Sequence, residues 1–578
     1  MSFLSFVSLR VLRFATISSM SEQGFRSLVI GTALSFGILI SLPQLLYFTY
    51  PLSQGLPVEL NSDEDLYLSR VTEALEGRPE QSAEAIIGDI DILPLQGAFL
   101  EEWEGRLFAW TGLTAAGVFQ ILDAVIPPLL FLTLFWFLRL SGFSLWVSFS
   151  GAALFCLLEL YNLNRPVHQR ESFLLVLLAL CFLVEGVRGR RILGFFGGVI
   201  LGTLVGIYFW SWTFAWAWAG LLLFWLIYER ILEKKHEHPG FFRRFLALFR
   251  HEPSRALLSW QWLVLFLLTG VLFAVPHAIT LFAASRHPLM ELVRPRLELL
   301  HSREPESWFR TGLFLLQVLG VWGAFVVTKE LRKRCALVGI TVLTAFIVLH
   351  QQVIHGVVFL FSSHYLFPLV LAGVMVFLLS VLHIKDSKWL VLSLVGSLLF
   401  LLGIAYDGRY VINYFRIDEG RFTEQHLASA LPELRRLPRT TILSDVDTMR
   451  FLASHTKHDV PYSARLNYML IRDEELAERY CLAKIALPMP AWRIEEDPVL
   501  FYDPDVIETD PRKRTYELHL VQQTCRRMTI DPGTFLKEYD ITHILWDTRR
   551  QQGWNVNRFK VNLKEVERGA EWVLYEIQ

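Results

Sequence analysis

Residues 61–70 read N-S-D-E-D-L-Y-L-S-R and carry three adjacent acids at positions 63, 64 and 65. They follow closely on residues 27–50, the first long apolar run of the chain. Ionisable groups are costly to hold next to a membrane, and where they occur they mark functional sites. We therefore expect this stretch to be functional if the rest of the chain places it beside a membrane.

The 578-residue chain has the composition of a membrane protein. It is 53% hydrophobic and 14% aromatic, its mean hydropathy is +0.38, and only 19% of its residues are charged. Soluble domains are about 45–50% apolar and about 25% charged. Apolar runs of roughly 20 residues, long enough to span a bilayer, recur as far as residue 406 and none follow. The net charge of −1, without a basic stripe, argues against a nucleic-acid partner.

About eleven transmembrane helices are expected from these runs. The predicted ranges are 27–50, 117–138, 143–162, 172–187, 192–210, 213–229, 260–283, 310–328, 335–350, 365–383 and 389–406. Alternate loops are basic, with their Lys and Arg residues at 139, 188–191, 234–255, 329–334 and 385–388. Cytoplasmic loops are enriched in these residues, so we predict that the N-terminus and these loops are cytoplasmic.

An odd number of spans then places the loop 51–112 and the C-terminal tail outside the cytoplasm, in the periplasm of a Gram-negative cell. Near the N-terminus no small-residue cleavage site follows a short apolar core, so we expect no signal peptide. The chain thus divides into a cytoplasmic segment (1–26), a multi-spanning membrane domain (27–406) and an extracytoplasmic domain (407–578).

Residues 407–578 show the pattern of a small α/β domain. The sequence T-T-I-L-S-D at 440–445 predicts a strand that runs into a turn, and a helix follows at 447–456 with Asp447 as its cap. A helix at 473–484 and strands at 541–547 and 572–577 continue the alternation. Cys481 and Cys525 could pair in an oxidising compartment, and two free thiols are an equal alternative. The predicted fold class is an α-helical polytopic membrane protein with a C-terminal soluble α/β domain.

The acidic stretch resembles a motif of membrane glycosyltransferases of the GT-C fold. Asp63, Glu64 and Tyr67 form D-E-x-x-Y, which is similar to the acidic motif after the first transmembrane helix of aminoarabinose and mannosyl transferases. In a second register, Asp65 and Tyr67 with Arg70 resemble the D-x-Y-x-x-x-R motif of oligosaccharyltransferases, with the arginine one residue early. The resemblance covers the first outer loop, the pattern of spans and the soluble tail.

This resemblance implies transfer of a sugar from a polyprenyl-phosphate-linked donor to a glycan, lipid or protein acceptor at the outer face of the membrane. The acceptor hydroxyl needs a base as it attacks the anomeric carbon, and the leaving phosphate needs cationic or hydrogen-bonding partners. Asp63 is the favoured base, Asp65 is close behind it, and Glu64 is the third catalytic candidate. Displacement in one step inverts the anomeric centre.

Substrate-binding candidates come from the motif and from three other outer loops. They are Tyr67, Arg70, Arg165, His168, Arg294, Arg296 and His364. The fork of an arginine can bind a phosphate or orient a carboxylate. Structural alternatives are interfacial snorkelling in the loop 162–172, a solvated amphipathic helix in 284–309, and a structural histidine in 351–365. The polar residues of that last segment predict a re-entrant piece that lines a cavity.

The loop 162–171 lacks the second Asp-x-Asp that metal-dependent oligosaccharyltransferases offer there. We therefore name no metal ligand and no cofactor beyond the lipid-linked sugar donor, and keep a divalent metal as an alternative. A lipid or polysaccharide transporter or flippase is a second functional hypothesis, although the sequence shows no inverted repeat and no paired broken helices. A non-catalytic membrane assembly protein, with the tail as its binding module, is the third.

Overall fold

The computed structural model describes the greater part of the chain. The described residues are 21–60, 64–78, 92–95, 97–165, 167, 169–233, 257–297, 299–305, 307–359, 365–408, 415–487, 501–502 and 504–578. Three of the candidate site residues, Asp63, His168 and His364, lie outside these ranges.

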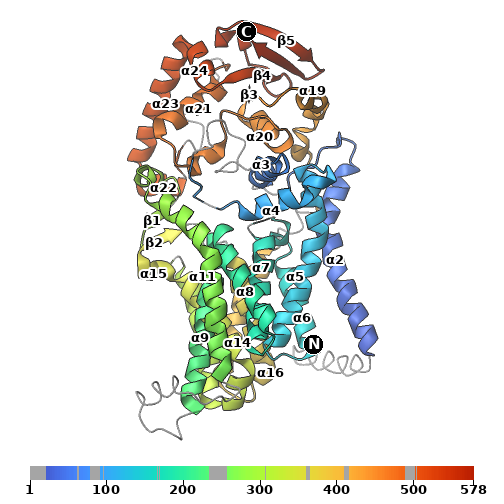
Figure 1. Cartoon of the computed structure of the whole chain (residues 1–578), viewed down its shortest axis with the longest axis vertical. Helices are drawn as coiled ribbons and strands as arrows, with labels where there is room; N and C mark the ends of the chain where they lie inside the picture. Colours follow the sequence, from blue (N-terminus) through green and yellow to red (C-terminus); the bar gives the residue numbers. More distant parts are fainter. Residues whose placement is uncertain are drawn as a thin grey trace.

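A bundle of long helices forms the first part of the molecule (Figure 1). The helices are α2 (Glu22–Phe48), α5 (Ala115–Leu140), α6 (Leu145–Leu158), α7 (Arg170–Val187), α8 (Arg191–Thr203), α9 (Phe209–Glu233), α11 (Leu257–Ser285), α13 (Trp308–Val327), α14 (Lys329–Leu349), α16 (Leu366–His383) and α17 (Trp389–Asp407). Each span expected from the sequence coincides with one of them. Among the described residues, 7 helices are long and apolar enough to cross a membrane.

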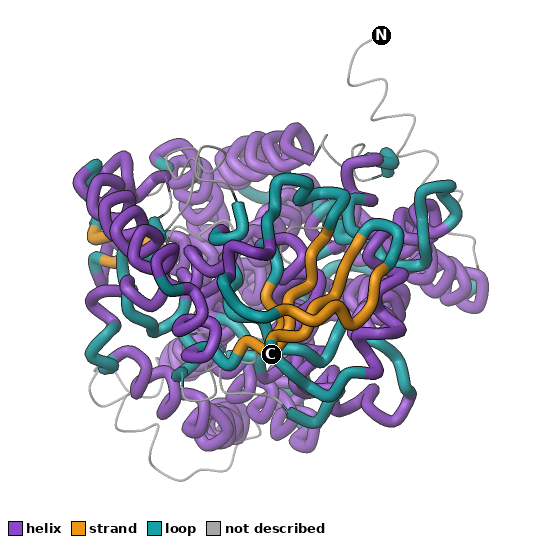
Figure 2. Tube along the Cα trace, turned by 90° about the horizontal axis from the view of Figure 1, so that it is seen from above, coloured by secondary structure: helices purple, strands orange, loops and turns teal. Residues whose placement is uncertain are grey.

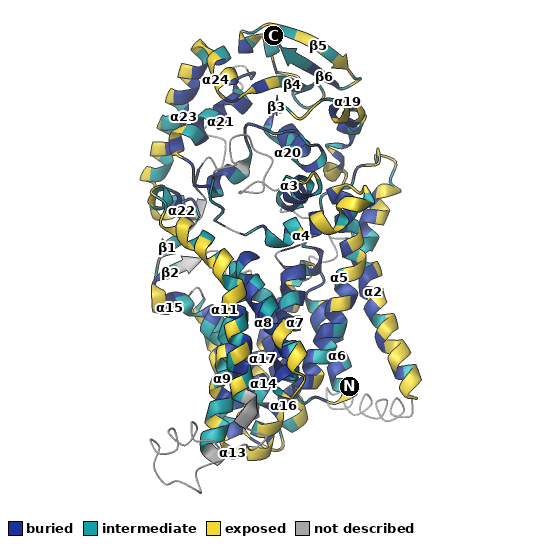
Figure 3. Cartoon of the chain, viewed as in Figure 1, coloured by how far each residue is buried: buried dark blue, intermediate teal, exposed yellow. Residues whose placement is uncertain are grey.

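The outer faces of these helices carry exposed apolar side chains. Figure 3 shows exposed residues along α2 and α11. Among them are Ile30, Leu34 and Ile38 of α2 and Leu272 of α11. Apolar surface left in water costs about 25 cal/mol per Å². Patches of this kind on a soluble protein mark interaction sites, and along entire helices they are suited to lipid. The chain is a multi-pass membrane protein.

Glycines let several of these helices approach closely. A Cβ added to Gly186 of α7 would lie 2.4 Å from the Cα of Gly194 of α8, and one added to Gly198 would lie 2.3 Å from the carbonyl oxygen of Phe266 on α11. Small residues at such crossings allow backbones to touch, which is how membrane helices gain packing energy. The glycines therefore fix the arrangement of α7, α8 and α11.

The C-terminal domain is built on a four-stranded sheet (Figure 2). Its strands are β3 (Thr441–Leu443), β4 (Ile541–Asp547), β5 (Leu563–Arg568) and β6 (Trp572–Ile577) in the order β3-β4-β6-β5. Strand β3 is parallel to β4, and the other pairs are antiparallel. Its helices are α19 (Leu431–Arg436), α20 (Val446–His455), α21 (Asp473–Lys484), α22 (Pro504–Thr509), α23 (Arg512–Ile530) and α24 (Pro532–Glu538).

This domain has the expected α/β architecture, with two local differences. Helix α20 begins one residue earlier than expected, and its N-cap is Asp445, whose Oδ1 accepts a hydrogen bond from the Thr448 N–H; the assignment of the cap to Asp447 was wrong. The edge strand β5 was not expected from the sequence. Cys481 and Cys525 form a disulfide between α21 and α23, whereas Cys156, Cys181 and Cys335 are free and buried.

Two short helices of the first loop lie between the helical bundle and the C-terminal domain (Figure 1). Helix α3 (Glu64–Leu75) packs against α4 (Phe99–Phe108) and against α20. Two other loops meet near this end in a small ribbon, where β1 (Leu299–His301) pairs with β2 (Val357–Phe359). Residues 351–359 therefore form the short helix α15 (Gln351–His355) and a paired strand, where the sequence predicted a re-entrant segment.

Two described residues of the basic loops contact the ends of neighbouring helices. The Arg188 guanidinium donates a hydrogen bond of 2.9 Å to the carbonyl oxygen of Leu140, and Arg332 pairs with Glu229 at 3.2 Å. Helices α3 and α4 lie at one end of the bundle with the C-terminal domain (Figure 1), and α5 runs from that end to Leu140, which Arg188 contacts.

Candidate functional site

A pocket lies where the first loop, the helical bundle and the C-terminal domain meet. The enclosed space is about 30 Å³, and about 420 Å³ there is free of protein atoms when the adjoining open solvent is counted. Its lining comes from α2, the loop before α3, α3 itself, α5, the turn before α7 and α20 of the C-terminal domain. The lining residues are Gln44, Pro57, Val58, Glu59, Glu64, Leu68, Ala116, Phe119, Gln120, Asp123, Asn164 and His455. Segments far apart in the sequence thus form one pocket.

Two of the carboxylates in this lining come from the first loop. Glu64 begins α3, and its Oε2 accepts a hydrogen bond of 3.2 Å from the Leu60 N–H. The start of a helix favours negative charge. Burial raises the pKa of Glu59 to about 8, although the nearby charge of Arg450 acts in the opposite direction. This carboxyl therefore changes its protonation state slightly above neutral pH.

The third carboxylate, Asp123, projects from α5 and is held by a buried arginine. Arg170 of α7 lies 2.5 Å from Asp123 and 2.5 Å from Glu171, and its guanidinium is completely buried. It also donates to the carbonyl oxygen of Leu163 at 3.3 Å. A planar guanidinium with several acceptors holds a carboxylate in one orientation. Asp123 is therefore presented to the pocket in a fixed position.

Two cations near the acidic loop come from the C-terminal domain. Arg450 of α20 lies 2.9 Å from Glu424 and 3.8 Å from Glu59. Arg465 lies 3.4 Å from Asp65. The sequence predicted cations from the outer loops 162–172 and 284–309 instead. Arg450 and Arg465 were not expected, because no local pattern in the sequence shows that the tail contacts the first loop.

The candidates of the motif are divided between the pocket and its surroundings. Glu64 lines the pocket, and Asp65 is largely buried beside Arg465. Tyr67 packs into an apolar cluster with Phe119, and Arg70 forms a buried ion pair of 3.0 Å with Glu101 of α4. Tyr67 and Arg70 are therefore held in contacts within the protein, and neither is among the residues that line the pocket.

The cationic candidates of the later loops occupy other surroundings. Arg294 is on the surface and pairs with Glu291 at 3.4 Å. Arg296 is buried, donates a 2.5 Å hydrogen bond to the carbonyl oxygen of Ile471 and lies 3.6 Å from Asp473. It thus joins its loop to the C-terminal domain and does not line the pocket. Arg165 is half-buried directly after the pocket residue Asn164.

Sequence reasoning missed Asp123 although a signal was present. An acid inside a predicted apolar span is rare and marks function by default, and Asp123 lies within the predicted span 117–138. Glu59 and His455 carried no comparable signal. Among the described residues, no group of three or more His, Cys, Asp or Glu side chains could hold a metal ion.

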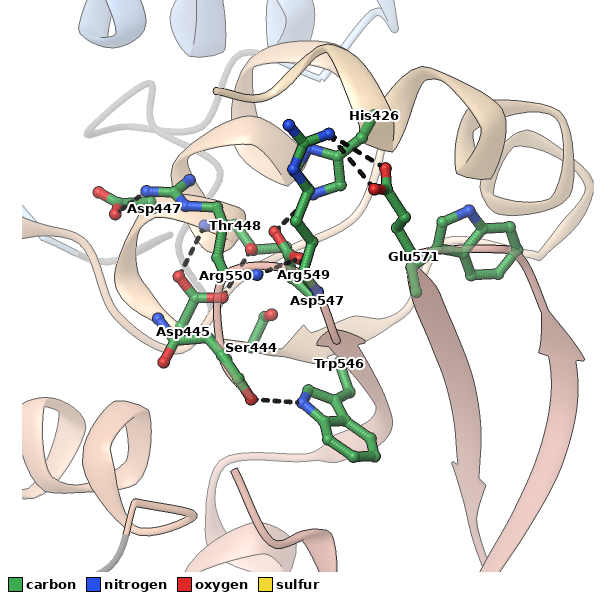
Figure 4. A network of polar contacts seen from close by, with 12 residues as sticks. His426, Ser444, Asp445, Asp447, Thr448, Trp546, Asp547, Arg549, Arg550 and Glu571 are labelled. Atoms are coloured by element: carbon green, nitrogen blue, oxygen red, sulfur yellow. Dashed lines mark hydrogen bonds and ion pairs between the residues drawn. The ribbon is translucent and has the colours of Figure 1, made fainter. Parts of the chain in front are cut away.

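A polar network in the C-terminal domain holds the start of α20, whose other end reaches the pocket (Figure 4). The imidazole of His426 donates from Nε2 to the Asp547 carboxylate at 2.8 Å, and both side chains are buried. The Thr448 hydroxyl donates to Asp445 at 2.6 Å, and Arg550 pairs with Asp447. These contacts join the start of α20 to the turn that follows β4. They therefore hold α20, and with it Arg450 and His455, in one position.

Comparison with known proteins gives a distant structural likeness. No family model matches the sequence, and no curated protein matches it. Among solved structures, the Archaeoglobus fulgidus oligosaccharyltransferase in complex with Zn and sulfate overlaps with 90% of this chain and 68% of its own, at 12% identity and a TM-score of 0.41. This overlap is too loose to carry a functional conclusion, which has to come from the pocket itself.

Proposed function

We propose that the chain is a glycosyltransferase that moves a sugar from a polyprenyl-phosphate-linked donor to an acceptor at the outer face of the membrane. The observation that carries the proposal is the pocket beside the acidic motif. It brings together Glu59 and Glu64 from the first loop with Asp123 from α5, at the end of the membrane bundle. A water-soluble donor from the cytoplasm would not reach this end if the basic loops are cytoplasmic.

The chemistry needs one carboxylate as a base and others that bind hydroxyls. The base takes the proton of the acceptor hydroxyl while its oxygen forms a bond to the anomeric carbon. The bond from that carbon to the lipid phosphate breaks, the phosphate leaves with the electron pair, and the anomeric centre inverts. Asp63 is the proposed base, with Asp65 and Glu64 as the alternatives.

The lining of the pocket suits a hydroxyl-bearing sugar. Carboxylates and the amides of Gln44, Gln120 and Asn164 accept or donate hydrogen bonds, and Leu68 and Phe119 supply an apolar wall. No Lys or Arg is among the lining residues that the structure describes. A phosphate therefore belongs outside this pocket, and Arg165, next to Asn164, is the candidate to contact it.

The disulfide supports an extracytoplasmic position for the tail. Disulfides persist in oxidising compartments and are rare in the cytoplasm, and Cys481 and Cys525 are joined. With the tail outside, the pocket opens on the side where a polyprenyl-linked sugar is presented.

The test is a transfer assay in proteoliposomes with a panel of polyprenyl-phosphate sugars and the membrane glycolipids of the host as acceptors. We expect transfer by the wild-type protein, and none by Asp63→Asn or Asp65→Asn, with unchanged membrane insertion. Glu76→Gln, an exposed acid just after α3, is the matched control and should retain activity. If both aspartate variants transfer sugar at the wild-type rate, the assignment of the base is wrong; if wild-type protein transfers none of the panel sugars, the proposed function fails.

A further inference from the structure

Helix α4 has its polar and apolar faces the opposite way round from a helix on a soluble surface. Glu101 is completely buried and Glu104 is 6% exposed. Trp103 and Leu107 are 56% and 61% exposed, and Trp110 in the following 3₁₀ turn η1 (Ala109–Thr111) is 84% exposed. Carboxylates thus point into the protein, while large apolar side chains point out.

The inward face of α4 is fixed to the acidic motif. Glu101 pairs with Arg70 of α3 at 3.0 Å. A Cβ added to Gly105 would lie 2.3 Å from the Cβ of Ala74, so α3 and α4 cross with almost no space between them. Burial and the nearby carboxylate of Glu171 raise the pKa of Glu104 well above its ordinary value, and a neutral carboxyl can stay inside. These contacts leave α4 one orientation.

The outward face forms a single stripe. Positions 103, 107 and 110 are separated by four and three residues, the spacing of one side of a helix. The stripe continues through Leu113 into α5, where Ile121 and Val125 are also exposed. The side chains of α5 that face outward on a membrane-spanning helix are covered by lipid, and the stripe on α4 is continuous with them.

We propose that α4 and η1 lie in the interfacial layer of the bilayer, with Trp103, Leu107 and Trp110 inserted among the lipids. Tryptophan is enriched at this depth because its ring is apolar and its N–H finds polar partners there. Amphipathic helices of this kind lie in the plane of the interface. Arg106, exposed on the same side, reaches the headgroup phosphates. Through Arg70 and Ala74, the bilayer surface then fixes the depth of α3 and of the acidic motif at its start.

The proposed occupant of this surface is lipid and not a partner protein. The contact does not depend on sugar transfer, so it holds or fails independently of the proposed function. Spin labels on introduced cysteines measure it directly, because the three free native cysteines are buried and the other two are joined. The probe is the full-length protein in nanodiscs of phosphatidylcholine with a minority of phosphatidylglycerol.

The label is placed at Trp110→Cys and, in a second protein, at Leu107→Cys. Leu272→Cys, exposed in the middle of α11, is the reference for the bilayer core, and Ile530→Cys at the end of α23 is the reference for water. Accessibility to oxygen relative to a water-soluble nickel complex reports depth. We expect both test labels to lie between the two references.

Two results overturn the proposal. A label at both test positions with the accessibility of Ile530→Cys would place α4 in water. A label at both positions that is shielded from oxygen and from the nickel complex would show that protein covers the stripe. Melting curves that match wild type confirm that each labelled protein is folded, and the second test position covers the case in which one variant is not.

Discussion

Arg465 of the C-terminal domain lies 3.4 Å from Asp65 of the first loop, across a sequence separation of 400 residues. The contact is not isolated. The Ser454 hydroxyl donates to the carbonyl oxygen of Asp65, and Arg421 donates to that of Glu59 at 2.6 Å. The C-terminal domain therefore contacts the first loop directly and positions Asp65. A tail that served only as a binding module would not need these contacts.

Replacing Arg465 should slow sugar transfer more than it weakens the fold. The ion pair with Asp65 is partly exposed, so Arg465→Gln should cost less than about 1 kcal/mol of stability. Loss of the fixed carboxylate orientation should lower the transfer rate by about tenfold, equivalent to about 1.4 kcal/mol in the barrier. Initial rates and melting temperatures measure the two effects. Arg436→Gln, exposed on α19, is the control, and equal rates for the two variants would contradict a positioning role.

Removing the buried arginine should destabilise the membrane domain strongly. Arg170→Met leaves Asp123 and Glu171 without their shared cation, and breaking a buried pair in this way costs about 3–5 kcal/mol. Thermal unfolding of the detergent-solubilised protein measures the loss. The matched control is Arg190→Met, because Arg190 pairs with Glu185 at 3.4 Å but is exposed, and the cost there should stay below about 1 kcal/mol. A similar fall in melting temperature in both variants would show that the buried network contributes no more to stability than an exposed ion pair.

The stability of the protein should depend on pH through Glu59. Its pKa is raised from 4.5 to about 8 in the folded protein, so the folded state holds the proton more tightly than the unfolded chain. The stabilisation is complete below pH 4.5 and is lost as the pH rises to about 8. Relative to Glu59→Gln, which cannot ionise, the wild-type protein should become less stable as the pH rises through this window. Parallel melting curves that keep a constant difference across this range would contradict the raised pKa.

The disulfide should be present in cells and should stabilise the C-terminal domain. Its two cysteines are 44 residues apart, and in the chain-entropy model closing such a loop contributes about 4 kcal/mol. Alkylation before lysis, followed by mass spectrometry, should recover a linked Cys481–Cys525 peptide, and Cys481→Ser should lower the melting temperature. Recovery of both thiols in alkylated form from intact cells would argue against an extracytoplasmic tail.

Local patterns in the sequence predicted the long helices of the bundle and three of the four strands of the C-terminal sheet, but not β5. Each expected span coincides with a helix because a long apolar run favours one, and 7 of the described helices are long and apolar enough to cross a bilayer. Alternating short strands and helices in the tail likewise predicted β3, α20, α21, β4 and β6. The cap of α20 was assigned to the wrong aspartate because Asp445 and Asp447 both stand near the start of the helix in a suitable pattern, and only the backbone shows which one accepts the Thr448 N–H.

The tertiary structure alone decided which residues surround the pocket and which face of α4 is buried. Arg296 and Arg465 are both arginines of polar segments in the sequence, yet one joins a loop to the tail and the other reaches the acidic motif. The sequence of 61–70 identified where to look, because its three adjacent acids with Tyr67 and Arg70 follow closely on the first apolar run and resemble a known motif. It could not show that Asp123 and the cations of the tail lie beside this stretch, because contacts between distant parts of the chain depend on how separate elements pack and not on any local pattern.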